Sequence, residues 1–144
     1  MNTEKIGNFY ASEFVTPEIY NKFGAIKSWW FIRPEVVAIC ELLRLQFQKP
    51  VTINNWKVGG TFDLRGFRPP HSIGAENSQH RLGAAADINI EGHDSNEIRA
   101  HILQYKTLYM AKGLTTLEDA AFAPTWVHFD IRWTGDKDIL IVKP

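Results

Sequence analysis

The ten residues from Ser78 to Asp87 constrain this chain more than any other segment, because they combine two potential metal ligands with a run of small residues. His80 and Asp87 lie seven positions apart, and the small residues at 83–86 allow the loop carrying His80 to lie close against the segment that carries Asp87. A second histidine, His128, comes forty-one positions after Asp87. Imidazole nitrogen and carboxylate oxygen both suit Zn²⁺, and three protein ligands leave its fourth position open for water. We therefore predict a catalytic zinc site made of His80, Asp87 and His128.

Length and charge describe an ordinary globular domain. The chain has 144 residues, enough to bury a core without cross-links, and we expect one domain over residues 1–144. Its 16 basic and 16 acidic residues cancel, so no charge pattern predicts binding to nucleic acid or to a membrane surface. The composition leaves the partner open.

The cysteine content and the N-terminus limit the chemistry and the location. A single cysteine, Cys40, excludes an internal disulfide and a cysteine zinc cage, and its apolar surroundings at 36–43 predict a buried thiol. Residues 1–5 show no charged-then-apolar signal pattern, and no apolar stretch approaches the length of a membrane span. We expect a chain that is made in the cytoplasm and reaches any substrate outside it without its own secretion signal.

Three helices are predicted from start and stop signals. Thr16 is a suitable N-cap for a short helix ending at Gly24, and Pro34 begins a second helix that ends at 49–50. Asp94 is the expected cap of a third helix, which Gly113 ends. The apolar face expected for this third helix consists of Ile98, Ile102, Tyr105 and Tyr109.

Four short strands complete the prediction, at 51–53, 86–90, 127–131 and 139–142. Alternation in the second strand places Asp87 on one face and its apolar neighbours on the other. The order of elements predicts an α+β fold with a small, mainly antiparallel sheet and helices packed on one side. Residues 54–79 show neither helical nor strand periodicity. A loop of this length inside a compact domain is often functional, and this one leads into His80, so we predict a functional loop.

The segment from 51 to 131 resembles the M15 family of zinc D-Ala-D-Ala peptidases and phage peptidoglycan endopeptidases, in particular its short, phage-associated members. The family pattern Ser-x-His-x-x-Gly-x-Ala-x-Asp is filled completely by residues 78–87. A Gly-aromatic-Arg-Pro turn at 66–69 and an aromatic-flanked valine-histidine at 126–128 are further family elements. The resemblance implies a hedgehog/D-Ala-D-Ala-peptidase-like fold, a zinc metallopeptidase and a peptidoglycan peptide substrate, and we expect a monomer.

Carried over by motif, the resemblance assigns zinc to His80, Asp87 and His128, and the scissile carbonyl oxygen or its oxyanion to Arg68. Without the resemblance, the favoured interpretation of Arg68 is a salt bridge in its loop, with Asp63 or Glu76. Three further residues are candidates for contact with the substrate or for lining the cleft: Ser78, His71 and Trp126.

The general base is the open question. Better-known members of the family place a glutamate three residues before the last histidine, where this chain has Thr125. Asp130 lies on the same strand face as His128 and is the first candidate, either as base, as partner of an imidazole, or as a fourth ligand. Glu118 and Asp119, expected in the preceding loop, are the other candidates.

These observations predict a zinc peptidase that cuts D-amino-acid-containing stems or crosslinks of peptidoglycan, after release from the cell or as part of a phage particle. The missing glutamate keeps a second hypothesis open: a non-catalytic zinc- or cell-wall-binding module of a phage or secretion assembly. A third hypothesis is a zinc hydrolase that acts on a different substrate, since the fold and the metal ligands do not determine the substrate.

Overall fold

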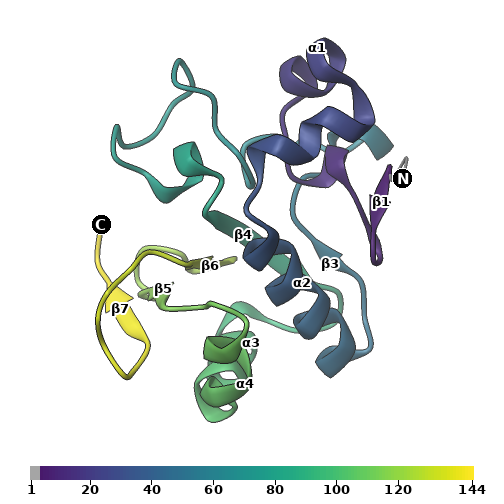
Figure 1. Cartoon of the computed structure of the whole chain (residues 1–144). Helices are drawn as coiled ribbons and strands as arrows, with labels where there is room; N and C mark the ends of the chain where they lie inside the picture. The colour runs from purple at the N-terminus through teal and green to yellow at the C-terminus, as the bar shows by residue number, and fades with distance from the viewer. Residues whose placement is uncertain (1–3) are drawn as a thin grey trace.

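A five-stranded sheet forms the centre of the molecule, as the computed structural model of residues 4–144 shows (Figure 1). Residues 1–3, part of the segment without a signal pattern, lie outside the described residues. The strand order is β3-β4-β6-β5-β7, and every neighbouring pair is antiparallel except β5 and β7. The strands are β3 (Val51–Thr52), β4 (Ala85–Ile90), β5 (Thr116–Glu118), β6 (Val127–Asp130) and β7 (Leu140–Val142). This confirms the predicted α+β class and the mainly antiparallel sheet.

Four α-helices accompany the sheet in the described chain: α1 (Pro17–Lys27), α2 (Pro34–Phe47), α3 (Ser95–Gln104) and α4 (Lys106–Ala111). The caps are as predicted, because Thr16 Oγ1 accepts a hydrogen bond from Ile19 N and Asp94 Oδ1 accepts one from Glu97 N. Gly24 interrupts the helical backbone of α1, at φ +78° and ψ 172°, as predicted, and a further turn continues to Lys27. Gly113, at φ +108°, follows the end of α4 as predicted. The prediction of one unbroken third helix is wrong, because it breaks at Tyr105 into α3 and α4 and Tyr105 is exposed.

Two features have no counterpart in the sequence prediction. Residues 5–10 form a small hairpin of β1 (Lys5–Ile6) and β2 (Phe9–Tyr10). Strand β5, in a segment for which the sequence predicts a loop, lies between β6 and β7. Its parallel pairing with β7 brings the C-terminal segment to the edge of the sheet.

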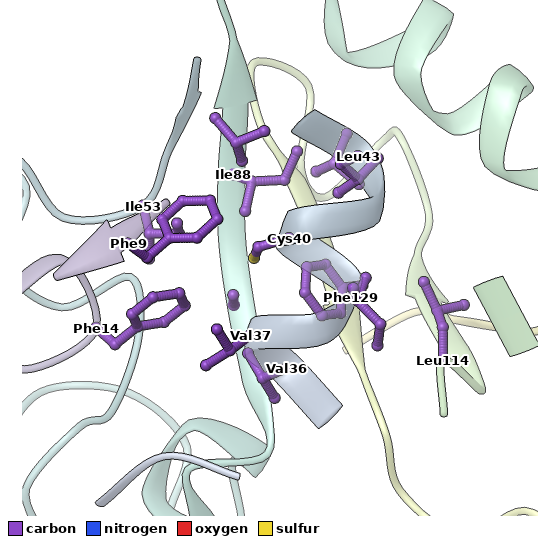
Figure 2. Packing of buried hydrophobic residues seen from close by; sticks show 14 of the residues in the cluster. Phe9, Phe14, Val36, Val37, Cys40, Leu43, Ile53, Ile88, Leu114 and Phe129 are labelled. Carbon is purple, nitrogen blue, oxygen red and sulfur yellow. The ribbon is translucent and has the colours of Figure 1, made fainter. Parts of the chain in front are cut away.

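The hydrophobic core lies between α2 and the sheet (Figure 2). Cys40 is fully buried on the sheet-facing side of α2, as predicted, and burial raises the pKa of its thiol well above the ordinary value. Ile88 of β4 and Phe129 of β6 contribute to the same cluster, together with Ile98 of α3. Residues that alternate with these on β4 and β6, including Asp87 and His128, are turned to the other face of the sheet. One face of the sheet thus forms the core and the other is available for a site.

The long segment 54–79 contains little regular structure beyond a 3₁₀ turn, η3 (Trp56–Val58). Asn54 anchors its start, since its amide Nδ2 donates to Val15 O and its Oδ1 accepts from Arg65 N. Its other end leads into η4 (Gln79–Leu82), the 3₁₀ turn that carries His80. Among residues 4–144, no helix is both long and apolar enough to cross a membrane.

Two glycines of the family pattern are required by close backbone contacts. Gly83 has φ +65°, and a Cβ there would lie 2.0 Å from Phe31 O. A Cβ at Gly66 would lie 2.2 Å from Phe14 O. Any side chain at either position would push η4 or the Arg68 loop away from the molecule, and so displace the residues they carry.

Candidate metal centre

Two adjacent strands and one 3₁₀ turn bring the three predicted ligands together. Asp87 of β4 and His128 of β6 are directly opposite each other in the antiparallel ladder, so their side chains leave the same face of the sheet. His80 approaches this pair from η4, where Ser78 Oγ caps the turn by accepting from His80 N at 3.3 Å. All three side chains are buried.

The three candidate ligand atoms lie close enough together to share one metal ion. His128 Nδ1 lies 2.8 Å from Asp87 Oδ1 and 3.2 Å from His80 Nε2, and His80 Nε2 lies 3.3 Å from Asp87 Oδ1. Ligand atoms about 2.0–2.1 Å from a tetrahedral ion are separated from one another by roughly 3.3 Å. The buried group could therefore hold a metal ion, and its two nitrogens and one oxygen suit zinc.

Outer partners hold both imidazoles so that one nitrogen of each is directed at the cluster. Gly66 O lies 2.8 Å from His80 Nδ1, and a carbonyl oxygen can only accept, so Nδ1 carries the proton and Nε2 offers its lone pair. On His128 the arrangement is reversed: Nε2 lies 3.2 Å from Asp130 Oδ2, which leaves Nδ1 for the metal. Such partners fix the tautomer of a metal-binding histidine and strengthen it as a ligand.

Asp130 lies behind His128 and is completely buried. Arg132 holds its carboxylate in a two-pronged contact, with Nε donating to Oδ1 at 2.8 Å and Nη2 to Oδ2 at 2.5 Å. Strand alternation correctly places Asp130 on the His128 face, but its oxygens are occupied by Arg132 and by Nε2 of the imidazole. Of the roles open at Asp130, this geometry supports partner of the imidazole.

The charges of the cluster stabilise one another. Burial by itself lowers the pKa of the His128 imidazole, but the hydrogen bonds to Asp130 and Asp87 outweigh it and raise the pKa to about 9. Burial raises the pKa of Asp87, yet hydrogen bonds from His128 and His80 hold it well below its usual value. Burial also raises the pKa of Asp130, but hydrogen bonds with His128 and Arg132 outweigh this effect and lower the pKa to about 2. In the metal-free protein, His128 is thus a buried imidazolium between two carboxylates.

This arrangement predicts a pH-dependent stability for the metal-free protein. A histidine whose pKa rises from about 6.5 unfolded to about 9 folded contributes stability in full below pH 6.5 and loses it as the pH rises through 9. We expect the free energy of unfolding, measured by urea titration in the presence of a chelator, to fall by on the order of 3 kcal/mol between pH 6.5 and 9.5. The fall should be largely absent in His128→Gln. Equal pH dependence in both proteins would contradict the buried imidazolium.

The cluster lies in a cleft of about 390 Å³, which Arg68 also lines. Arg68 Nη2 contacts Asp87 Oδ2 at 3.0 Å, and Nε donates to Leu64 O at 2.7 Å. Its salt bridge is thus with a predicted metal ligand, and not with Asp63 or Glu76. Among the described residues Nη1 has no hydrogen-bond partner, so this nitrogen of the guanidinium can still donate.

The remaining candidate residues differ in whether they line this cleft. Ser78 and Trp126 line the same cleft as His80, and Ser78 also caps η4. His71 lies outside that lining, with its Nε2 2.9 Å from Glu18 Oε2 and most of its side chain exposed. Asp119 is engaged in a turn, since its Oδ1 accepts from Ala121 N.

Sequence reasoning missed two arginines that organise the site. Arg132 lies two residues beyond Asp130, past the end of β6, and holds the carboxylate of Asp130 from there. Arg99 of α3 is nearly buried and donates to three backbone carbonyls, those of Glu118, Ala123 and Trp126. Its guanidinium thereby holds the segment that leads into His128. No local pattern distinguishes Arg99 from an exposed helical arginine.

A scan against models of protein families, a search of curated proteins and a search of solved structures each found no match.

Proposed function

We propose that this chain is a zinc-dependent peptidase that hydrolyses peptide bonds involving D-amino acids in bacterial peptidoglycan. The observation that carries the proposal is the buried group of His80, Asp87 and His128, with outer partners on both imidazoles and an arginine beside it in a cleft. The substrate class rests on the resemblance of residues 66–69, 78–87 and 126–128 to the M15 pattern. The site of action is the cell wall, reached after release from the cell or within a phage particle.

A zinc ion held by the three ligands would polarise the attacking water and the scissile carbonyl. Asp87 Oδ1 faces His128 and would be the oxygen offered to the ion, while Arg68 holds Oδ2 and keeps the carboxylate from rotating away. Arg68 itself is held by Leu64 O, and its free Nη1 can donate to the carbonyl oxygen as negative charge develops there. The fixed planar guanidinium suits this role better than a flexible ammonium group.

The other residues of the site position these groups. Asp130 accepts from His128 Nε2 and keeps Nδ1 directed at the metal, and Arg132 keeps Asp130 charged. Ser78 holds the η4 turn and therefore the direction of His80. Trp126 gives the cleft an apolar wall, against which a substrate side chain can pack.

Mass spectrometry of peptidoglycan digests tests this function. Zinc-loaded protein should convert crosslinked muropeptides or complete stems into shorter peptides, and the mass lost identifies the bond. Asp87→Ala protein and chelator-treated wild type should leave the same substrate intact. Uncut muropeptides with the zinc-loaded wild type, in a reaction where a known peptidoglycan peptidase cuts them, would contradict the proposal.

One observation favours a non-catalytic alternative. Thr125 stands where better-known M15 members have a glutamate, and its backbone oxygen accepts from Asn89 Nδ2, which is a structural contact. Under this alternative the chain binds zinc or cell wall as part of a phage or secretion assembly. Zinc bound at one ion per chain, with binding to peptidoglycan but no change in muropeptide mass, is the result it predicts.

A further inference from the structure

Glu118 is the last residue of β5 and lines the same cleft as Asp87 and His128. Thr116 pairs with Asp130 and Leu117 with Phe129, and continuing this register by one residue directs Glu118 towards His128. His128 in turn is opposite Asp87 on β4. Residues directly opposite in an antiparallel sheet have Cβ atoms about 4.5–5.5 Å apart and point to the same face. Asp87 and His128 are such a pair, and alternation along β5 puts Glu118 on the same face as Thr116, the partner of Asp130.

Glu118 is the acid of the cleft whose carboxylate is not occupied. It lines the same cleft as Asp87 and His128 and is half-buried. Among the described residues, its side chain has no hydrogen-bond or salt-bridge partner. By contrast, the carboxylate of Asp130 is held by Arg132 and His128, and Asp119 caps a turn. Of these three acidic residues, Glu118 is therefore the one whose carboxylate oxygens have no hydrogen-bond partner among the described residues.

The backbone beneath Glu118 is held firmly. Arg99 Nε donates to Glu118 O at 3.3 Å, and its Nη2 donates to Trp126 O at 2.6 Å. On the other side, β5 is paired with β7, where Glu118 is matched with Val142. One buried guanidinium therefore connects the backbone of Glu118 to the segment that carries His128. A positioned side chain on a fixed backbone is what proton transfer requires.

We propose that Glu118 is the general base of the peptidase reaction and takes the role that Thr125 cannot fill. This inference rests on the proposed function. Glu118 accepts a proton from the attacking water as the water oxygen bonds to the peptide carbonyl carbon. It then gives that proton to the amide nitrogen as the C–N bond breaks, so that a carboxylic acid and an amine are released. The carboxylate returns to its starting charge, and no other reactant is needed.

Glu118→Gln tests this role, because it keeps the size of the side chain but cannot accept the proton. We expect kcat to fall by about 10²–10⁴-fold, with zinc still bound at one ion per chain and the thermal unfolding temperature unchanged. The matched control is Asp119→Asn, the neighbouring acid, which should keep wild-type kcat. Wild-type kcat in Glu118→Gln would overturn the inference, and so would loss of zinc, since Glu118 would then be a ligand.

A second readout does not depend on turnover. A phosphinate dipeptide imitates the tetrahedral geometry of the hydrated peptide bond, and its bound oxygen should share a proton with the base. Calorimetric titration in two buffers of different ionisation enthalpy should show uptake of about one proton per phosphinate in the zinc-loaded wild type and in Asp119→Asn. In Glu118→Gln we expect no uptake. Equal proton uptake in Glu118→Gln and wild type would assign the proton to another group.

The two proposals fail in different ways. If the zinc-loaded wild type leaves muropeptides uncut and binds the phosphinate without proton uptake, the peptidase function fails and this inference with it. If the wild type cuts muropeptides and Glu118→Gln cuts them at the same rate, only the assignment of Glu118 fails.

Discussion

Replacing Asp87 with alanine will abolish tight zinc binding. Asp87 is the proposed ligand that contacts both histidines, with Oδ1 2.8 Å from His128 Nδ1 and 3.3 Å from His80 Nε2. Loss of an outer partner of a zinc ligand already costs about 10–100-fold in affinity, and loss of a ligand from a set of three should exceed this. We expect the dissociation constant, measured by competition with a chromophoric chelator, to rise more than about 100-fold.

The control for this experiment is Asp138→Asn. Asp138 forms an exposed ion pair with Lys106, so this variant removes one carboxylate at the surface and should bind zinc like the wild type. Circular dichroism of the metal-free variants separates loss of zinc from loss of fold. An Asp87→Ala protein that is folded and binds zinc with wild-type affinity would rule out the three-ligand site.

If the chain is the proposed peptidase, replacing Arg68 with alanine should remove most of its catalytic rate and leave zinc binding in place. Removal of one group that stabilises a developing oxyanion costs about 10²–10³-fold in kcat. We expect a fall of this size in kcat against a soluble muropeptide, with zinc retained at one ion per chain. Arg68→Lys should recover little of the loss, because an ammonium group cannot contact Asp87, Leu64 O and the substrate at once.

Arg33→Ala is the matched control for Arg68. Arg33 pairs with Glu35 at 3.5 Å, and more than half of its side chain is exposed. Its loss removes the same charge away from the cleft, and an exposed pair of this kind contributes little to stability. Wild-type kcat in Arg68→Ala would show that the arginine acts only as a salt-bridge partner of Asp87.

The half of the site near Ser78 could be predicted from the sequence because its determinants are local. The Ser78 cap, the turn at His80 and the glycine at 83 lie within six consecutive residues, and strand alternation then places Asp87 on the face of β4 away from the core. The strands with clear alternation were also predicted correctly. These features depend on short-range hydrogen bonds and on side-chain periodicity, which a sequence displays directly.

The half near His128 depends on contacts between distant segments. Alternation predicts that Asp130 shares a face with His128, but not that Arg132 occupies its carboxylate. Strand β5 has only three residues and is defined by its pairing with β6 and β7, so Glu118 could only be predicted as a loop residue. Long-range pairing of short strands leaves almost no local signal.

X-ray absorption at the zinc edge measures directly which side chains bind the metal. Protein loaded with one equivalent of zinc should show only nitrogen and oxygen neighbours at about 2.0–2.1 Å, with the outer-shell scattering of two imidazoles. In His128→Ala the scattering of one imidazole should disappear. A sulfur neighbour at about 2.3 Å, or a wild-type spectrum without imidazole scattering, would contradict a site made of His80, Asp87 and His128.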